Sequence, residues 1–383
     1  MQRMQRFALL VALLVTAVAQ AQTQPPVPAP PSLAAESHIL IDVHSGRVLA
    51  ENNADERVEP ASITKIMTAY VVFDHLESGD ISLDDRVAIS ERAWRMEGSR
   101  MFIEVDTKVA LENLLRGLVV QSGNDASVAL AEHIAGSESA FAELMNFHAG
   151  ELGMEGTHYT NATGLPDAEH YTTARDTATL SAALIREFPE EYAYFAEREF
   201  TYNNIRQSNR NDLLWRDIGA DGLKTGHTES AGYCLAASAE RDGMRLVSAV
   251  MGTDSQKARA RQSTALLKYG FRFFETVQPY TGGEQLVTAE VWRGRLGEVP
   301  LVVEEDLYLT IPRGRYSELD ATTRVSAPLS APIAVGEPLG HLAVMLDGEE
   351  LARRPLVAGE SVARANFAKR WWHGLRLWIR GVL

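Results

Sequence analysis

The sequence predicts an α/β (α+β) fold that is followed by a small all-β domain. Segments typical of short strands lie near 37–51 and again within 221–252, whereas the chain between them is typical of helices. The first and last of these strands can be neighbours in one sheet, with the helices as an insert between them. From about residue 277 the pattern changes to short alternating runs, which indicates a second, all-β unit.

The first 21 residues are typical of a secretory signal peptide. Two arginines precede an apolar run from Phe7 to Ala19, which ends in the A-x-A cleavage pattern Ala19-Gln20-Ala21. This run is short for a membrane span, so an uncleaved anchor is the weaker interpretation. Residues 22–35 follow as a proline-rich linker.

Residues 36–276 are expected to form the first domain. It opens with a hairpin around Ser45-Gly46 and closes with two apolar strands around a turn at 241–243 and a helix over Ser255–Thr276. The helices predicted between these ends cover 62–78, 111–121, 124–135, 138–152 and 173–187. Residues 277–362 are expected to form the all-β domain.

Composition excludes several classes of function. The formal net charge of −14 argues against nucleic acid or another polyanion as the main partner. Cys234 is the only cysteine, so core packing rather than a disulfide must stabilise the exported chain, and its apolar surroundings are typical of a buried strand. No H-E-x-x-H or paired C-x-x-C motif is present, and we expect neither a metal nor another cofactor.

The stretch P-A-S-I-T-K places Ser62 and Lys65 at the start of an apolar helix. Residues i and i+3 share a helical face, so the hydroxyl and the amine can meet. The apolar residues that follow cover too much of the helix for a surface position, which predicts that Lys65 is buried. Lowering a lysine pKa from about 10.4 to near 7 corresponds to roughly 4–5 kcal/mol. A neutral amine there can take a proton from the serine, and a lysine paired with an acid is the alternative.

Two further triplets accompany this pair. Ser122-Gly123-Asn124 lies at a predicted helix end, and Lys224-Thr225-Gly226 opens a late strand, where it uses another of the only six lysines. The three motifs together are improbable by chance, which favours one common site.

The order S-x-x-K, S-x-N, K-T-G resembles the motifs of the penicillin-binding proteins and serine β-lactamases. The longer stretches P-A-S-I-T-K-I-M-T-A-Y, S-G-N-D-A, D-G-L-K-T-G-H-T and G-F-R-F-F-E-T-V resemble low-molecular-mass penicillin-binding proteins, the serine-type D-alanyl-D-alanine carboxypeptidases of peptidase family S11. The resemblance covers nearly the whole mature chain. It implies a transpeptidase-like catalytic domain with a helical insert over 36–276 and an all-β C-terminal domain over 277–362.

The resemblance also implies catalytic roles. Ser62 would be the nucleophile that forms an acyl-enzyme, and Lys65 would be its base. Ser122 and Lys224 would carry a proton to the leaving D-alanine, and Asn124 would hold the peptide amide.

Substrate binding is implied for the late strand and two arginines. The backbone N–H groups of Ser62 and His227 would form the oxyanion hole. Because the chain has 31 arginines, a solvated surface role is the alternative for Arg210 and Arg259. The implied substrate-binding residues are Lys224, Thr225, Gly226, His227, Arg259 and Arg210.

The implied activity is removal of the terminal D-alanine from peptidoglycan stem pentapeptides, with β-lactam antibiotics as inhibitors. A D,D-endopeptidase or a weak β-lactamase of the same fold is an alternative, and a catalytically idle wall-binding scaffold is another. The chain lacks the E-x-x-L-N element that supplies a carboxylate base in class A β-lactamases, so we expect β-lactams to leave slowly. The intact motif residues argue against the scaffold.

Residues 363–383 are expected to form an amphipathic helix that anchors the protein to a membrane. On a helical projection one face is apolar over about 160° and the other is basic. The stretch 366–383 would lie on the anionic lipid surface, at the periplasmic face of the bacterial inner membrane. A helix docked on the protein's own surface is the alternative. The apolar face comprises Phe367, Trp371, Trp372, Leu375, Trp378, Ile379, Val382 and Leu383, and the basic face Lys369, Arg370, His373, Arg376 and Arg380.

Overall fold

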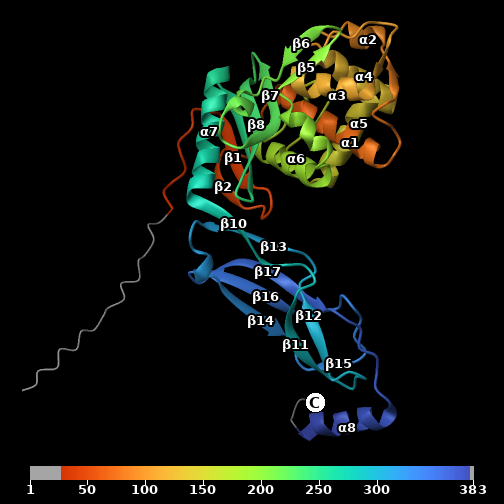
Figure 1. Ribbon diagram of the computed structural model, residues 1–383, viewed down its shortest axis with the longest axis vertical. Helices are drawn as coiled ribbons and strands as arrows, with labels where there is room; N and C mark the ends of the chain where they lie inside the picture. Colours follow the sequence, from red (N-terminus) through yellow and green to blue (C-terminus); the bar gives the residue numbers. More distant parts are fainter. Residues whose placement is uncertain (1–26, 380–383) are drawn as a thin grey trace, which may run out of the picture.

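The computed structural model describes residues 27–379, and Figure 1 shows them as two units joined end to end. The expected signal peptide over 1–21 and the first residues of the proline-rich linker lie outside the described residues.

A five-stranded antiparallel sheet with the order β2-β1-β9-β8-β7 forms the centre of the first unit. The first strand pairs with the last, Ser37 with Met251 through Asp42 with Leu246, which confirms the predicted neighbourhood of the two ends of the domain. The strands are β1 (Ser37–Asp42), β2 (Val48–Asn52), β7 (Ala220–Thr228), β8 (Gly232–Arg241) and β9 (Met244–Thr253).

Both faces of this sheet are covered. Along β1 the apolar residues alternate, because Ile39 and Ile41 pack with the helical insert whereas Leu40 packs with α7 (Gln256–Phe273). Figure 1 shows α7 on one side of the sheet and the insert on the other. The insert comprises α1 (Lys65–Glu77), α2 (Glu91–Trp94), α3 (Leu111–Arg116), α4 (Asn124–Ala135), α5 (Glu138–Glu151) and α6 (Ala174–Glu187).

Three helices differ from the prediction at their ends. The helix expected over 62–78 begins with a 3₁₀ turn, η1 (Ala61–Thr64), and the helix expected over 111–121 becomes a π-helix, η2 (Gly117–Gln121). The last helix ends at Phe273 rather than Thr276, because the chain becomes extended at Phe274 and pairs with the second unit.

Short elements complete the first unit. Two small hairpins were not predicted, because their strands have only three or four residues. They are β3 (Arg86–Ala88) with β4 (Lys108–Ala110) and β5 (Glu199–Tyr202) with β6 (Ile205–Ser208), and the 3₁₀ turns η3 (Glu191–Ala196) and η4 (Asp212–Trp215) lie beside them in sequence.

The second unit is all-β, as predicted, and has its own apolar core. A two-stranded sheet pairs β10 (Phe274–Tyr280) with β13 (Leu307–Pro312), and the larger sheet has the order β14-β16-β17-β12-β11-β15. Its elements are β11 (Gln285–Trp292), β12 (Glu298–Val302), β14 (Asp320–Val325), β15 (Leu329–Ser330), β16 (Pro338–Leu346) and β17 (Glu349–Ala358), with η5 (Tyr316–Glu318) after β13. A boundary at 276/277 stays a prediction.

The two units contact each other at the β1–β2 hairpin. Arg47 donates from Nη1 to the carbonyl oxygen of Thr310 at 2.6 Å, and the ring of His44 stacks on that of Tyr308 at 5.0 Å between centroids. The hydroxyl of Thr276 donates to the carboxylate of Asp42.

The described residues end in helix α8 (Phe367–Ile379), which lies beyond the far end of the all-β unit (Figure 1). The helix begins at Phe367 rather than at 363, and residues 380–383 of the predicted tail lie outside the described residues. His373 holds it there, since its Nδ1 accepts a hydrogen bond of 2.9 Å from the backbone N–H of Arg293 and its ring packs edge-on against Trp292. Phe367, Trp371 and Trp372 are 76%, 64% and 53% exposed. The helix therefore contacts its own protein through a residue of the basic face, and these apolar side chains remain largely exposed, although Phe367 and Trp371 also border a hollow beside Ser330.

Candidate active site

The three sequence motifs meet at one cleft in the first unit, of about 670 Å³. Ser62 and Ser122 open into it, while Lys65 and Lys224 lie buried behind them, 1% and 3% exposed. Every other predicted site residue lines the cleft. The lining includes Ser62, Ser99, Arg100, Phe102, Ser122, Asn124, Thr163, Gly164, Arg210, Thr225, Gly226, His227, Tyr233 and Arg259.

A close approach of three backbone segments fixes Ser62. Ala61, directly before it, has φ of +47°, a left-handed conformation that costs energy for a residue with a Cβ. Gly164 has φ of +81°, and a Cβ there would lie 1.8 Å from the carbonyl oxygen of Ala61. Gly226 of β7 also lies close to this turn, since a Cβ there would be 2.9 Å from the carbonyl oxygen of Pro60. Because both positions are glycine, the loop with Gly164 and strand β7 can lie in close contact with the turn that carries Ser62.

The amine of Lys65 has three neighbours. Its Nζ lies 3.1 Å from Oγ of Ser62, 2.7 Å from Oδ1 of Asn124 and 2.6 Å from the carbonyl oxygen of Thr163. The last two oxygens can only accept hydrogen bonds, so they take two N–H bonds of a neutral amine. The lone pair of that amine is then left for the hydroxyl of Ser62.

The pKa of Lys65 is lowered to about 7, chiefly by burial and secondly by repulsion from the guanidinium of Arg210. The carboxylates of Asp125 and Glu138 act in the opposite direction. Repulsion between the two lysines acts on the other amine, since the cation of Lys65 lowers the pKa of Lys224.

Ser122 and Lys224 form the second half of the site. Ser122 follows the π-helix η2 and has φ of +63°, a strained conformation that turns its side chain toward β7. Nζ of Lys224 lies 2.8 Å from Oγ of Ser122. Burial, reinforced by repulsion from Lys65, holds the pKa of Lys224 well below its ordinary value.

Asn124 is engaged at both ends of its amide. Its Oδ1 accepts from Lys65, and its Nδ2 donates to the carbonyl oxygen of Glu97 at 2.7 Å. In this structure Asn124 therefore positions the lysine, and a contact with the substrate amide stays a prediction.

Asp125 was given no role by the sequence analysis. Its buried carboxylate accepts from the backbone N–H groups of Met101, Phe102 and Ile103 at 2.9–3.3 Å, which fixes the loop along the cleft edge. Asp125 and its partners are 22 to 24 residues apart in the sequence. The only signal for Asp125 in the sequence is its position directly after the S-x-N motif.

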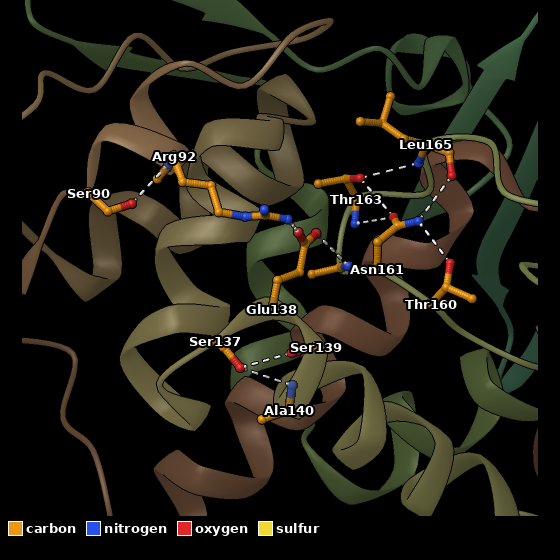
Figure 2. A network of polar contacts seen from close by, with 12 residues as sticks. Ser90, Arg92, Ser137, Glu138, Ser139, Ala140, Thr160, Asn161, Thr163 and Leu165 are labelled. Atoms are coloured by element: carbon orange, nitrogen blue, oxygen red, sulfur yellow. Dashed lines mark hydrogen bonds and ion pairs between the residues drawn. The ribbon is translucent and has the colours of Figure 1, made fainter.

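The loop Thr160–Leu165, which provides the carbonyl oxygen of Thr163, was also missed. Figure 2 shows how Asn161 organises it. Oδ1 of Asn161 accepts from the backbone N–H and the hydroxyl of Thr163, and also from the N–H of Gly164 at 2.8 Å. Nδ2 of Asn161 donates to the carbonyl oxygen of Leu165 at 3.1 Å.

A neutral histidine joins this loop to the turn before Lys65. Burial lowers the pKa of His170 to about 4. Its Nδ1 accepts from the backbone N–H of Thr160 at 3.0 Å, so Nε2 carries the proton and donates to the hydroxyl of Thr64 at 2.8 Å.

The side of the cleft formed by β7 and α7 is basic. Arg259 on α7 donates to the carbonyl oxygen of Gly226 at 3.0 Å and lies over the ring of Tyr233. The ring of His227 stacks on Tyr233 at 3.8 Å, and its Nδ1 pairs with the carbonyl oxygen of Gly232. The His227 ring is therefore held by β8, which leaves its backbone at the cleft.

Arg210 lies at the cleft edge without an acidic partner among residues 27–379. A carboxylate bound between Arg210 and Arg259 would find two guanidinium groups that make no ion pair within the described part of the protein. The same part of the chain contains no cluster of side chains that could hold a metal ion.

Comparison with known protein families matches both units. The profile of the family "D-alanyl-D-alanine carboxypeptidase" of peptidase type S11 matches residues 21–255. The profile of "Penicillin-binding protein 5, C-terminal domain" matches residues 274–364.

Individual relatives cover nearly the whole chain. The D-alanyl-D-alanine carboxypeptidase DacA of Escherichia coli strain K12 is 44% identical over 377 residues, which are 95% of this chain and 94% of that protein. The crystal structure of penicillin-binding protein 5 from Haemophilus influenzae is similar, with 42% identity and a TM-score of 0.85 over 88% of this chain and all of that one. The ampicillin-bound penicillin-binding protein D2 of Listeria monocytogenes covers 63% of this chain and all of its own, with 30% identity and a TM-score of 0.58.

The site geometry predicts that Lys65 titrates near pH 7. Arg210→Gln should raise that pKa, because it removes a positive charge that disfavours the lysine cation. Arg100→Gln is the matched control at the same cleft and should leave it nearly unchanged. Carbon and nitrogen NMR of protein with labelled lysine resolves the six residues, and titration of Lys65 near pH 10 would contradict the expected effect of burial.

Proposed function

Because the chain belongs to the D-alanyl-D-alanine carboxypeptidase family, we propose that it removes the terminal D-alanine from peptidoglycan stem pentapeptides through an acyl-enzyme on Ser62. The observation that supports the mechanism is the position of the Lys65 amine. Its two N–H groups donate to oxygens that can only accept, on Asn124 and Thr163. Its lone pair is then directed to Oγ of Ser62, 3.1 Å away.

In the first step, Oγ of Ser62 attacks the carbonyl carbon of the penultimate D-alanine, and its proton passes to neutral Lys65. The backbone N–H groups of Ser62 and His227 would receive the charge on the carbonyl oxygen. When the C–N bond breaks, the proton that Lys65 took from Ser62 passes to the D-alanine nitrogen by way of Ser122, which is hydrogen-bonded to Lys224, and Lys65 becomes neutral. The products are an ester on Ser62 and free D-alanine.

In the second step, water attacks the ester carbonyl carbon. Lys65, neutral again, takes the water proton, the C–O bond to Ser62 breaks, and the serine oxygen regains a proton. The peptide leaves shortened by one residue. The same amine thus serves both steps, and neither step needs a metal ion or another cofactor.

The free carboxylate of the substrate would be bound by Thr225, Arg259 and Arg210. Thr225 lies on β7 directly after Lys224, and both arginines line the same cleft. A carboxypeptidase needs such a feature, because it must distinguish a chain end from an internal peptide bond. This arrangement favours carboxypeptidase over endopeptidase activity.

β-Lactams would acylate the same serine. A relative of this fold, penicillin-binding protein D2 of Listeria monocytogenes, is known in ampicillin-bound form. Slow release is expected because the described residues place no carboxylate in hydrogen-bond distance of Ser62 or among the cleft residues. A weak β-lactamase is therefore the less favoured alternative.

The protein would act at the periplasmic face of the inner membrane, held there by residues 366–383. Outward-facing Phe367, Trp371 and Trp372 support this location, since large apolar groups of an interfacial helix insert into lipid. No helix within residues 27–379 is long and apolar enough to span a bilayer. The leader over 1–21 would direct export.

The first test of this function is the site of acylation. Penicillin should add one acyl group to Ser62, and Ser62→Ala should abolish both the adduct and release of D-alanine from a peptide ending in D-Ala-D-Ala. Ser78→Ala, at the exposed other end of the same helix, is the matched control and should retain both. Mass spectrometry of the peptic digest identifies the acylated residue, and an adduct on another residue would contradict the mechanism.

A second test concerns the terminal carboxylate. Arg259→Gln and Arg210→Gln should each lower kcat/KM for the free acid by about 10- to 100-fold, as expected for loss of a charge-assisted hydrogen bond of about 1.5–3 kcal/mol. Cleavage of the corresponding peptide amide should already be slow and should change little. Arg261→Gln, exposed on the same helix as Arg259, is the control. Equal rates for acid and amide in the parent protein would remove both arginines from this role.

A third test concerns the tail. Deleting residues 366–383 should abolish binding to anionic lipid vesicles and leave acylation of Ser62 intact, because the cleft lies in the other unit. Changing Phe367, Trp371 and Trp372 to serine should detach the protein more fully than changing Arg370 and Arg376 to glutamine, because only the first set removes the apolar face. Co-sedimentation measures this, and a serine variant that pellets like the parent protein would show that the tail is no interfacial anchor.

A further inference from the structure

A buried glutamate lies at the back of the site, in a place where glutamate is normally exposed. Glu138 is the first residue of α5, after the N-cap Ser137, whose Oγ accepts from the backbone N–H of Ala140. A glutamate in the first turn usually faces solvent and interacts with the helix dipole. Glu138 is only 6% exposed, and its side chain turns inward (Figure 2). A buried carboxylate requires specific partners.

Each carboxylate oxygen of Glu138 has one partner. Oε2 accepts from the guanidinium of Arg92 on α2, and Oε1 accepts from the backbone N–H of Ala162 at 3.1 Å. The carbonyl oxygen of Ala162 in turn accepts from the hydroxyl of Thr68 on α1 at 2.7 Å. Both backbone polar groups of Ala162 are thus held by side chains of the two helices that flank the loop.

Ala162 directly precedes the carbonyl that Lys65 contacts. Asn161 makes the loop a rigid unit through its bonds to Thr163 and Gly164, but those bonds lie within the loop and do not attach it to the domain. The two anchors at Ala162 and the bond from Thr160 to His170 attach the loop to the domain, together with the bond from Lys65 itself to Thr163. A shift of Ala162 would carry the carbonyl oxygen of Thr163 away from Nζ of Lys65.

We propose that Glu138 is a positioning residue for the catalytic base: its carboxylate fixes the loop at Ala162 so that the carbonyl oxygen of Thr163 stays within hydrogen-bond distance of Lys65. The inference rests on the proposed role of Lys65 in activating Ser62. Glu138 acts through the loop and makes no contact with Ser62 or with the lining of the cleft.

The charge of Glu138 has a second, measurable effect. Its carboxylate favours the cation of Lys65 and so raises the pKa of that amine. Asp125 acts in the same direction, and repulsion from Arg210 acts in the opposite one. Two further titratable groups interact with Lys65, since its cation lowers the pKa of both Lys224 and His170. A neutral residue at 138 should therefore move the titration of Lys65 to lower pH.

Two substitutions separate the positioning role from the charge. Glu138→Gln keeps an oxygen that can accept from Ala162 but removes the charge, so the pH at which acylation by penicillin is half-maximal should fall while the plateau rate stays within about threefold. Glu138→Ala removes the anchor as well, and its plateau should fall by about 10- to 100-fold, as expected when a catalytic group is displaced by about an ångström. Glu143→Gln, exposed on the same helix, is the control for both.

The measurement is the second-order rate of acylation by a fluorescent penicillin from pH 5 to 9, with thermal unfolding recorded in parallel. If Glu138→Ala unfolds more easily but keeps the parent plateau and inflection, Glu138 only stabilises the helix and the proposal is wrong. If Glu138→Ala does not fold, Glu138→Met, which also removes the anchor at Ala162 but fills the space, decides by its plateau, and a plateau within threefold of the parent value overturns the proposal. Failure of the parent protein to acylate at Ser62 would instead refute the proposed function.

Discussion

Burial of one amine is the constraint on which the site depends. Lys65 is the largest of the fully buried side chains, and it lies where an ordinary lysine would be charged and solvated. Removing water destabilises its cation, and the pKa falls to about 7. A neutral amine still needs hydrogen-bond acceptors, and the structure provides two obligate ones, on Asn124 and Thr163. These acceptors turn the amine so that its lone pair meets Ser62.

The fold provides this environment by bringing three segments together at backbone distance. The turn that carries Ser62 lies between Gly164 of the loop and Gly226 of β7, and side chains at either position would collide with it. Ala61 and Ser122 both adopt left-handed conformations, which persist only when the surrounding structure holds them. The strained residues are therefore the one directly before Ser62 and Ser122 itself. A rigid core of apolar helices around α1 supports that arrangement.

The sequence could predict those features that are local in the chain or that depend on the type of side chain. Ser62 and Lys65 are one helical turn apart, and the apolar residues after Lys65 indicate burial, so the pair could be recognised from spacing alone. The apolar runs of β1 and β9 and the turns beside them are clear enough for the sheet to be expected. The end of α7 was placed three residues late, because Phe274 and the residues after it suit a helix or a strand and pairing with β13 decides between them.

Other parts depend on contacts that have no sequence signature. The acceptor on Thr163 is a backbone carbonyl, 98 residues from Lys65, and any residue type could provide it. Glu138 and Ala162 are 24 residues apart, and a glutamate at the start of a helix suggests a cap rather than a buried anchor. Asp125 likewise acts on backbone N–H groups of a distant loop. Such contacts appear only when the chain is folded.

The most direct test of the account is the pH dependence of acylation compared with the titration of the amine itself. The second-order rate of Ser62 acylation by penicillin should rise with pH through an inflection near 7, because only the neutral form of Lys65 can take the serine proton, and Lys65→Arg should show no such rise. The inflection should coincide with the NMR titration of Lys65 in the same protein. A rate that stays constant from pH 5 to 9, or an inflection that does not follow Lys65, would contradict a neutral lysine as the base.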